Sequence, residues 1–174
     1  MKTNMELKLE RIQRISTFLR AACTGFLGLT GMVAAGAVVA LLSGRLTSIT
    51  DGSHSFVVAD LRAPSRLILA GVCVATAAVL IKALYHLRRL FANYSRREIF
   101  TAGSAREIRQ FGISCILWGV VKTLWAFLPL ILLTNPPNTF SLALDSVFIG
   151  LVIFGISWFT EMAAELREEN ELTI

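Results

Sequence analysis

One positive charge, Lys122, lies deep inside a long apolar stretch, where it could take part in electrostatic chemistry that water would screen elsewhere. Trp118 precedes it by four residues and Trp125 follows it by three. In a helix both indole rings would share the face that carries the ammonium group. Because the face of an indole ring attracts a cation, the spacing predicts a lysine held between two tryptophans.

Asp145 is the acid that could complete this site, since it lies in another apolar stretch. It is about one turn from the end of that stretch, so we expect several ångströms of depth between the two charges. A long lysine side chain, a kink at Pro129 or a bridging water would close the gap. We predict that Lys122 faces the bundle interior or a partner helix. Two interpretations stay open: a charge that matters for activity, or a polar contact that fixes helix register.

These residues belong to four apolar stretches, which cover residues 18–42, 67–85, 113–133 and 140–159. A hydrocarbon core about 30 Å thick takes roughly 20 residues of helix, because lipid offers no partner for backbone polar groups. The chain has 174 residues, of which 55% are hydrophobic and 17% charged. A soluble domain would carry about 25% charged residues. We therefore predict one domain, 1–174, that is an all-α four-transmembrane-helix bundle.

The rest of the composition excludes several classes of function. The three cysteines, Cys23, Cys73 and Cys115, form no CxxC pair and lie within or at the ends of the stretches, where they behave as small apolar residues. No HExxH, GxSxG, Walker or GxGxxG motif is present. The first stretch is longer than a signal-peptide core and lacks a cleavage site, so we expect it to be retained. We predict no enzyme activity, no cofactor and no metal.

Basic residues predict the orientation of the chain. The N-terminal segment contains Lys2, Lys8, Arg11 and Arg14. The segment between the second and third stretches contains Arg88, Arg89, Arg96, Arg97, Arg106 and Arg109. Since such segments stay cytoplasmic, we predict a multi-pass membrane protein with both termini inside. These arginines would also meet the anionic headgroups of the lipid bilayer, so the pI near 9.6 does not indicate direct nucleic-acid binding.

Helix signals place the boundaries outside the membrane. Pro64 is typical of a helix start, and apolar residues at helical spacing continue the second helix beyond His86. Thr101 can cap the third helix, and Ser104 with Glu107 has the spacing of a capping box. The second and third helices would then extend into the cytoplasm as a helical hairpin. In the first outer loop, β-prone residues 46–50 and 55–58 favour a short β-hairpin.

Small residues and interfacial charges complete the picture of the apolar stretches. The small residues are Gly25, Gly28, Gly31, Ala35, Gly71 and Ala75. They predict close helix packing, within the chain or between copies of a homo-oligomer. Arg20, Lys82 and Glu161 lie near the inner ends of their stretches, where we expect long side chains to reach the headgroups.

An acidic C-terminal tail contains Glu165, Glu168, Glu169 and Glu171. It would emerge beside the basic hairpin, so we predict that the two dock. The hairpin and tail suggest a module that binds a cytoplasmic protein. The alternative is a small transporter or channel component with Lys122 and Asp145 on a polar path. A path needs several converging polar residues, and the fourth stretch has few, which favours the interaction module.

Two segments resemble a known family. The first leads into the third stretch and consists of Ile99, Phe100, Thr101, Ile108, Arg109 and Gly112. The second is the closing Glu-Leu-Thr-Ile of residues 171–174. Both are similar to bacterial membrane proteins of domain of unknown function 2975, although Gly103 and Ser104 stand where members often have Glu and Asn, which predicts weaker capping. The resemblance implies a four-helix inner-membrane protein, often encoded beside a helix-turn-helix regulator, without an established activity or catalytic residue.

Overall fold

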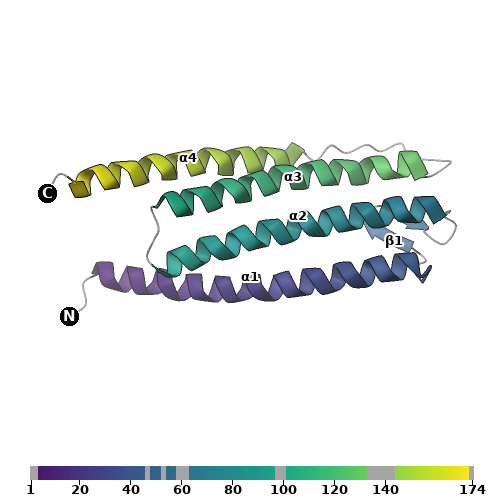
Figure 1. The fold of residues 1–174 in the computed structure, drawn as a ribbon, viewed down its shortest axis with the longest axis horizontal. Helices are drawn as coiled ribbons and strands as arrows, with labels where there is room; N and C mark the ends of the chain where they lie inside the picture. Colours follow the sequence, from purple (N-terminus) through teal and green to yellow (C-terminus); the bar gives the residue numbers. More distant parts are fainter. Residues whose placement is uncertain are drawn as a thin grey trace.

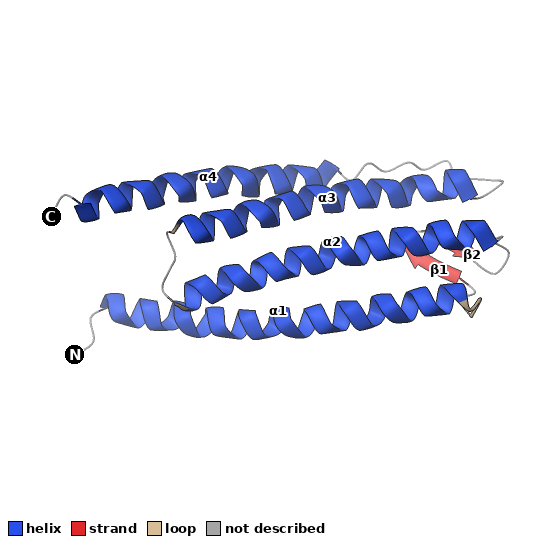
Figure 2. Ribbon diagram, in the orientation of Figure 1, coloured by secondary structure: helices blue, strands red, loops and turns tan. Residues whose placement is uncertain are grey.

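A computed structural model describes residues 4–45, 48–51, 54–57, 63–96, 101–132 and 144–172, with side chains for 10–45, 63–96, 101–128 and 144–166. The described residues form four helices and two strands (Figure 2). The helices are α1 (Asn4–Leu42), α2 (Ala63–Ser95), α3 (Ala102–Leu132) and α4 (Leu144–Leu172). Each one is long and apolar enough to cross a membrane. The prediction of a helical protein with four candidate membrane spans is confirmed.

The helices lie side by side in the order of the chain, so that α1 and α4 are at opposite edges (Figure 1). Packing between helices joins α1 to α2, α2 to α3, and α3 to α4. The sequence predicts a bundle, whereas the described helices form an open layer. Each helix consequently has faces that its own chain does not cover.

The uncovered faces carry large apolar side chains. Met32 on α1, Phe148 on α4 and Trp158 on α4 are 77%, 68% and 71% exposed. A buried apolar cluster, formed by Leu41, Leu69 and Leu128, joins α1, α2 and α3 near one end of the layer. Apolar surfaces of this extent are unfavourable in water and suit helices that are surrounded by lipid or by other apolar helices.

The two ends of the layer differ. At the end called here the hairpin end, α2 ends and α3 begins, and the start of α1 and the end of α4 lie there as well (Figure 1). At the opposite end, called the loop end, β1 (Ser48–Asp51) and β2 (His54–Val57) pair antiparallel, with Asp51 opposite His54. These strands lie in the loop where the sequence favours a hairpin.

Local signals at the helix ends explain most of the boundaries. Helix α2 begins at Ala63, with Pro64 next, as predicted. The Ser104 backbone N–H donates to Thr101 Oγ1 at 3.2 Å, so Thr101 caps α3. The predicted capping box of Ser104 and Glu107 is wrong, because Ser104 already lies inside the helix that begins at Ala102. Helix α3 continues through Pro129 to Leu132.

Gly112 and Gly150 allow close approach of the helices α3 and α4. A Cβ added to Gly150 would lie 2.9 Å from the backbone oxygen of Gly112 and 2.9 Å from the backbone nitrogen of Ile116. By contrast, a Cβ added to Gly28 or Gly71 would meet no atom within 4 Å. The small residues predicted on the first two helices therefore do not bring helices of this chain together, and packing between copies stays a prediction for them.

Candidate functional site

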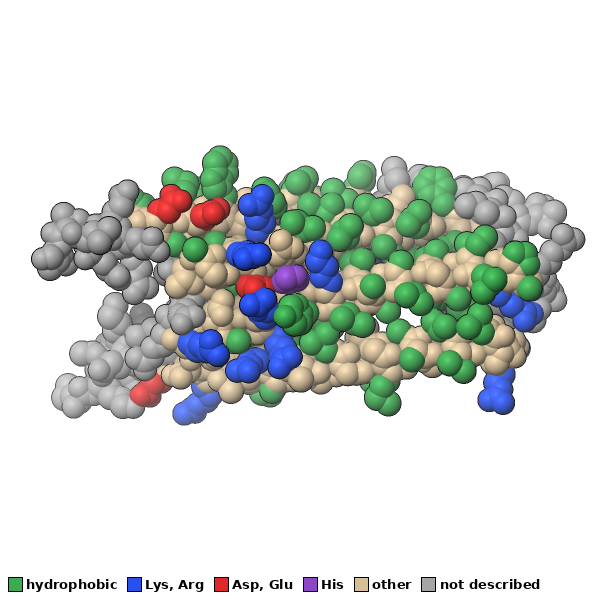
Figure 3. Space-filling view, in the orientation of Figure 1, with side chains coloured by type: hydrophobic (Ala, Val, Ile, Leu, Met, Phe, Trp, Pro, Cys, Tyr) green, Lys and Arg blue, Asp and Glu red, His purple; other side chains and the backbone are tan. Residues whose placement is uncertain are grey.

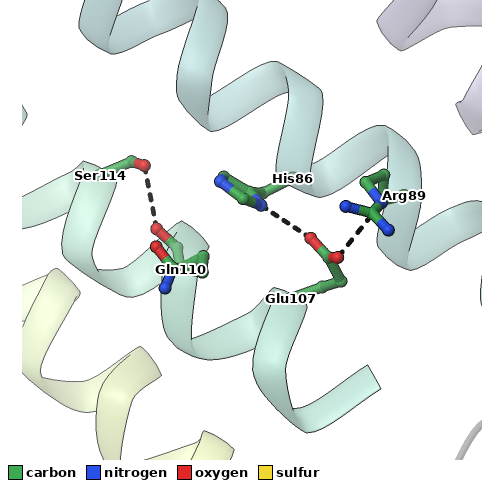
Figure 4. Close-up of polar contacts among 5 residues, drawn as sticks. All are labelled: His86, Arg89, Glu107, Gln110 and Ser114. Carbon is green, nitrogen blue, oxygen red and sulfur yellow. Dashed lines mark hydrogen bonds and ion pairs between the residues drawn. The ribbon is translucent and has the colours of Figure 1, made fainter. Parts of the chain in front are cut away.

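A buried carboxylate, that of Glu107, lies between α3 and α2 at the hairpin end. Its Oε2 is 2.7 Å from His86 Nδ1, and its Oε1 is 3.2 Å from Arg89 Nε (Figure 4). These three residues are called here the carboxylate cluster. Both carboxylate oxygens are thus satisfied by nitrogen donors from the neighbouring helix, which is what a buried acid requires.

The sequence produces this geometry in a simple way. His86 and Arg89 are three residues apart on α2 and therefore share one face of that helix. The turn between the antiparallel helices places Glu107 opposite them, 21 residues after His86. Because an ionised carboxylate only accepts hydrogen bonds, His86 Nδ1 is the donor in this pair. The cluster thereby holds His86 Nδ1 toward α3 and ties α2 to α3.

Tyr85 extends the cluster toward the surface. Its ring meets the His86 ring edge-on, with the centroids 5.5 Å apart. The Arg89 guanidinium lies 5.8 Å from the centre of the Tyr85 ring, within cation–π range. The Arg89 side chain is 58% exposed even so. Arg89 therefore reaches from a buried acid to the surface, and its position is restrained on two sides.

The neighbouring seam between α3 and α4 uses other means. The Arg109 guanidinium lies 5.1 Å from the centre of the Phe154 ring on α4. The buried Ser114 hydroxyl donates to the backbone oxygen of Gln110 within α3 at 2.9 Å (Figure 4). The Arg109 contact and the close approach at Gly150 keep α4 against α3, whereas the Ser114 hydrogen bond lies within α3.

Exposed arginines surround the carboxylate cluster. Figure 3 shows Lys and Arg side chains gathered toward the hairpin end, around one buried acid and one histidine. Among the predicted interaction residues, Arg89, Arg96, Arg106 and Arg109 are exposed and Arg88 is half-buried. Glu165 is exposed on α4, whereas Arg97 and the side chains of Glu168, Glu169 and Glu171 lie outside the described residues. Docking of the acidic tail on the hairpin stays a prediction.

The predicted intramembrane site is arranged differently from the expectation. Lys122 is exposed on α3 of the single chain, because the open layer leaves this face uncovered, so it does not face the interior of a bundle formed by this chain, and its contact with a partner helix stays a prediction. Trp125 Nε1 donates to Thr76 Oγ1 on α2 at 2.8 Å. The indole thus turns to a hydrogen-bond acceptor, which is scarce in an apolar environment, and Trp118 is half-buried. Among the described residues, cation–π contacts occur at Arg89 and Arg109 and not at Lys122.

Asp145 lies in the first turn of α4 and is exposed. A negative charge is stabilised there by the positive end of the helix dipole. Within the described side chains it forms no ion pair with Lys122, so the structure of one chain does not bring the two predicted charges into contact. The described part of the chain also contains no group of three His, Cys, Asp or Glu residues placed to hold a metal ion.

Comparison with known proteins gives a family for this chain. The model of a family described as protein of unknown function (DUF2975) matches residues 46–174, well over half of the sequence. The chain belongs to the DUF2975 family. The match includes α2, α3 and α4, with the whole carboxylate cluster, and leaves α1 outside it. No curated protein and no solved structure matches the sequence.

Sequence reasoning missed the central residues of this DUF2975 site. His86 received no role, and Glu107 was assigned to helix capping. A usable signal was present: Arg89 and Glu107, which are opposite in charge, stand at comparable distances before the end of α2 and after the start of α3. In an antiparallel hairpin such positions face each other across the seam.

Proposed function

We propose that this DUF2975 protein is a non-enzymatic, multi-pass protein of the bacterial inner membrane that binds a cytoplasmic protein through its hairpin end. The bias of arginine toward that end supports a cytoplasmic location for it, and hence for both termini. The four apolar helices supply the membrane anchor. In this role the exposed arginines around the carboxylate cluster form the contact surface.

The observation that carries the proposal is the pairing of buried Glu107 with His86 and Arg89. This cluster fixes α2 against α3 at the level where the arginines are exposed. A surface that is already ordered loses less entropy on binding than a flexible one. Arg96 and Arg106 are therefore presented on a rigid support, which suits recognition of an acidic protein surface. A helix-turn-helix regulator, implied by the family resemblance, is the proposed partner.

Site-specific photo-crosslinking in cells tests this proposal. A photoreactive residue at Arg106 should give one discrete protein adduct. The adduct should fall at least tenfold when Arg96→Gln is added, because the partner loses a charged contact beside the crosslinking position. A photoreactive residue at Met32, on the apolar face of α1, is the matched control and should not give that adduct. An adduct that persists unchanged in the Arg96→Gln chain, or that also forms from Met32, would contradict the proposal.

A second proposal is a small transporter or channel component with Lys122 and Asp145 on a polar path. It is supported by the exposure of both charges on apolar helices. Because one chain forms an open layer, such a path would require several copies. Solute or ion flux into vesicles that contain the purified protein, lost in Lys122→Leu and retained in Val120→Leu, is the expected result for this role.

A further inference from the structure

We infer that a second copy of this chain covers the face of the layer that carries Lys122 and Asp145, with Lys122 of each copy paired to Asp145 of the other. This inference goes beyond the proposed binding of a cytoplasmic protein and does not depend on it. It rests on the face, the depth and the complementary charges of the two residues.

Lys122 and Asp145 lie on the same face of the layer. The Arg109 guanidinium and the Phe154 ring contact each other across the seam between α3 and α4, and both residues are exposed, so their contact lies on one face of the layer. At 3.6 residues per turn, Lys122 lies about 140° around α3 from Arg109, and Asp145 about 180° around α4 from Phe154. Both charged side chains therefore lie on the face away from the Arg109 and Phe154 contact.

Lys122 and Asp145 also lie at similar depths, measured along the axes of α3 and α4. A Cβ added to Gly112 would lie 3.1 Å from the backbone oxygen of Gly150 and 3.2 Å from the backbone nitrogen of Phe154. Gly112 is thus at the depth midway between Gly150 and Phe154 on α4. Counting along the antiparallel helices from this point, Lys122 and Asp145 differ in depth by roughly three residues, about 4.5 Å. The four-carbon stem of lysine covers such a difference.

Contact with lipid would be unfavourable for the two charged residues on this face. Ionisable side chains within membrane helices are costly and almost always face protein or water. Lys122 and Asp145 are both exposed in the single chain. Around Asp145, Ile149 and Val152 on the same side of α4 are 53% and 46% exposed. The face is therefore apolar with one charge of each sign.

A second copy matches this face because the face is complementary to itself. A two-fold axis along the membrane normal keeps every residue at its own depth. It places Lys122 of one copy against Asp145 of the other and forms the same pair twice. By comparison, residues 11–45, which include the glycine-bearing edge of α1, contain no acid that could neutralise Lys122.

Charge reversal with mixing tests the inference on the full-length chain in lipid nanodiscs or mild detergent, with self-association followed by energy transfer between labelled copies. Lys122→Asp alone and Asp145→Lys alone should each weaken self-association at least tenfold, because each places like charges together. When these two variants are mixed, every pair is complementary again, so they should associate with each other about as well as the parent does. Rescue by mixing is specific to pairs between copies, since a pair within one chain would stay broken.

Several results would overturn the inference. These are a parent protein that remains monomeric, variants that associate like the parent, and folded variants that fail to associate when mixed. Gly28→Leu, on the edge of α1, is the control and should leave association unchanged; loss of association in that variant would assign the interface to α1.

A crosslinking measurement applies even if the charge variants fail to fold. In a chain with the three native cysteines replaced by alanine, a bifunctional thiol reagent should join copies of Ile149→Cys and not copies of Val120→Cys, which lies on the opposite face. Crosslinking of Val120→Cys with none at Ile149→Cys would refute the inference.

Discussion

Helix α3 is held by its two neighbours in opposite ways. Toward α2 it uses polar side chains: Glu107 contacts His86 and Arg89, and Trp125 donates to Thr76. Toward α4 it uses the absence of side chains, since Gly112 and Gly150 let the backbones meet. The polar seam depends on groups that are present, and the glycine seam depends on space that is left empty. Removal of atoms should therefore damage the first, and addition of atoms should damage the second.

The largest expected effect is on the polar seam. Glu107→Ala leaves the half-buried His86 without its acceptor and removes the partner of Arg89. We expect the free energy of unfolding to fall by about 3 kcal/mol, at the lower end for a broken buried ion pair because Arg89 is partly solvated. Titration of the purified protein with a denaturing detergent, followed by tryptophan fluorescence, measures this. Glu161→Ala, at an exposed position on α4, is the control, and an equal loss in both variants would show that burial of the acid is unimportant.

A smaller effect is expected at the glycine seam. Gly150→Ala adds a methyl group that would lie 2.9 Å from the backbone oxygen of Gly112 and 2.9 Å from the backbone nitrogen of Ile116. Backbone atoms cannot rotate out of the way as the end of a flexible side chain can. The two helices must then separate, and we expect a loss of about 2 kcal/mol in the same unfolding measurement. Gly155→Ala, where a Cβ meets no atom within 4 Å, should be neutral or slightly stabilising. Equal behaviour of the two variants would argue against the close approach of α3 and α4.

The smallest effect should come from the hydrogen bond between Trp125 on α3 and Thr76 on α2. Trp125→Phe keeps most of the ring and removes the donor to Thr76 Oγ1. Single hydrogen bonds between membrane helices contribute about 0.6 kcal/mol, so a loss of that size is expected. Trp158→Phe, at a 71% exposed position, controls for the change in fluorescence. A loss above that of Gly150→Ala would contradict the expected order of these two variants.

The sequence predicts the elements of this fold well because their signals are local. Twenty apolar residues in a row specify a membrane helix without reference to any partner. The start of α2 near Pro64 and the cap at Thr101 likewise depend on one turn of chain. The extension of α2 and α3 beyond the apolar stretches follows from residues within a few positions of each end.

The arrangement of the helices could not be predicted in the same way. The close approach at Gly150 requires the register of two antiparallel helices, and a stripe of small residues on α1 looks equally suitable from sequence. Glu107 illustrates the same limit: its spacing from Ser104 fits a cap, and only the position of α2 shows that its carboxylate contacts His86 instead. The exposure of Lys122 depends on the layer being open, which no local pattern specifies.

The order of the helices has a mechanical consequence. Because α1 and α4 lie at opposite edges, a displacement of α4 is transmitted to α1 through α3 and then through α2. Three contacts between helices lie on this path, and the weakest of them limits how far a displacement of the C-terminal helix is transmitted. The paired glycines, the buried acid and the packing of α1 on α2 thus together decide whether the two outermost helices move together or separately.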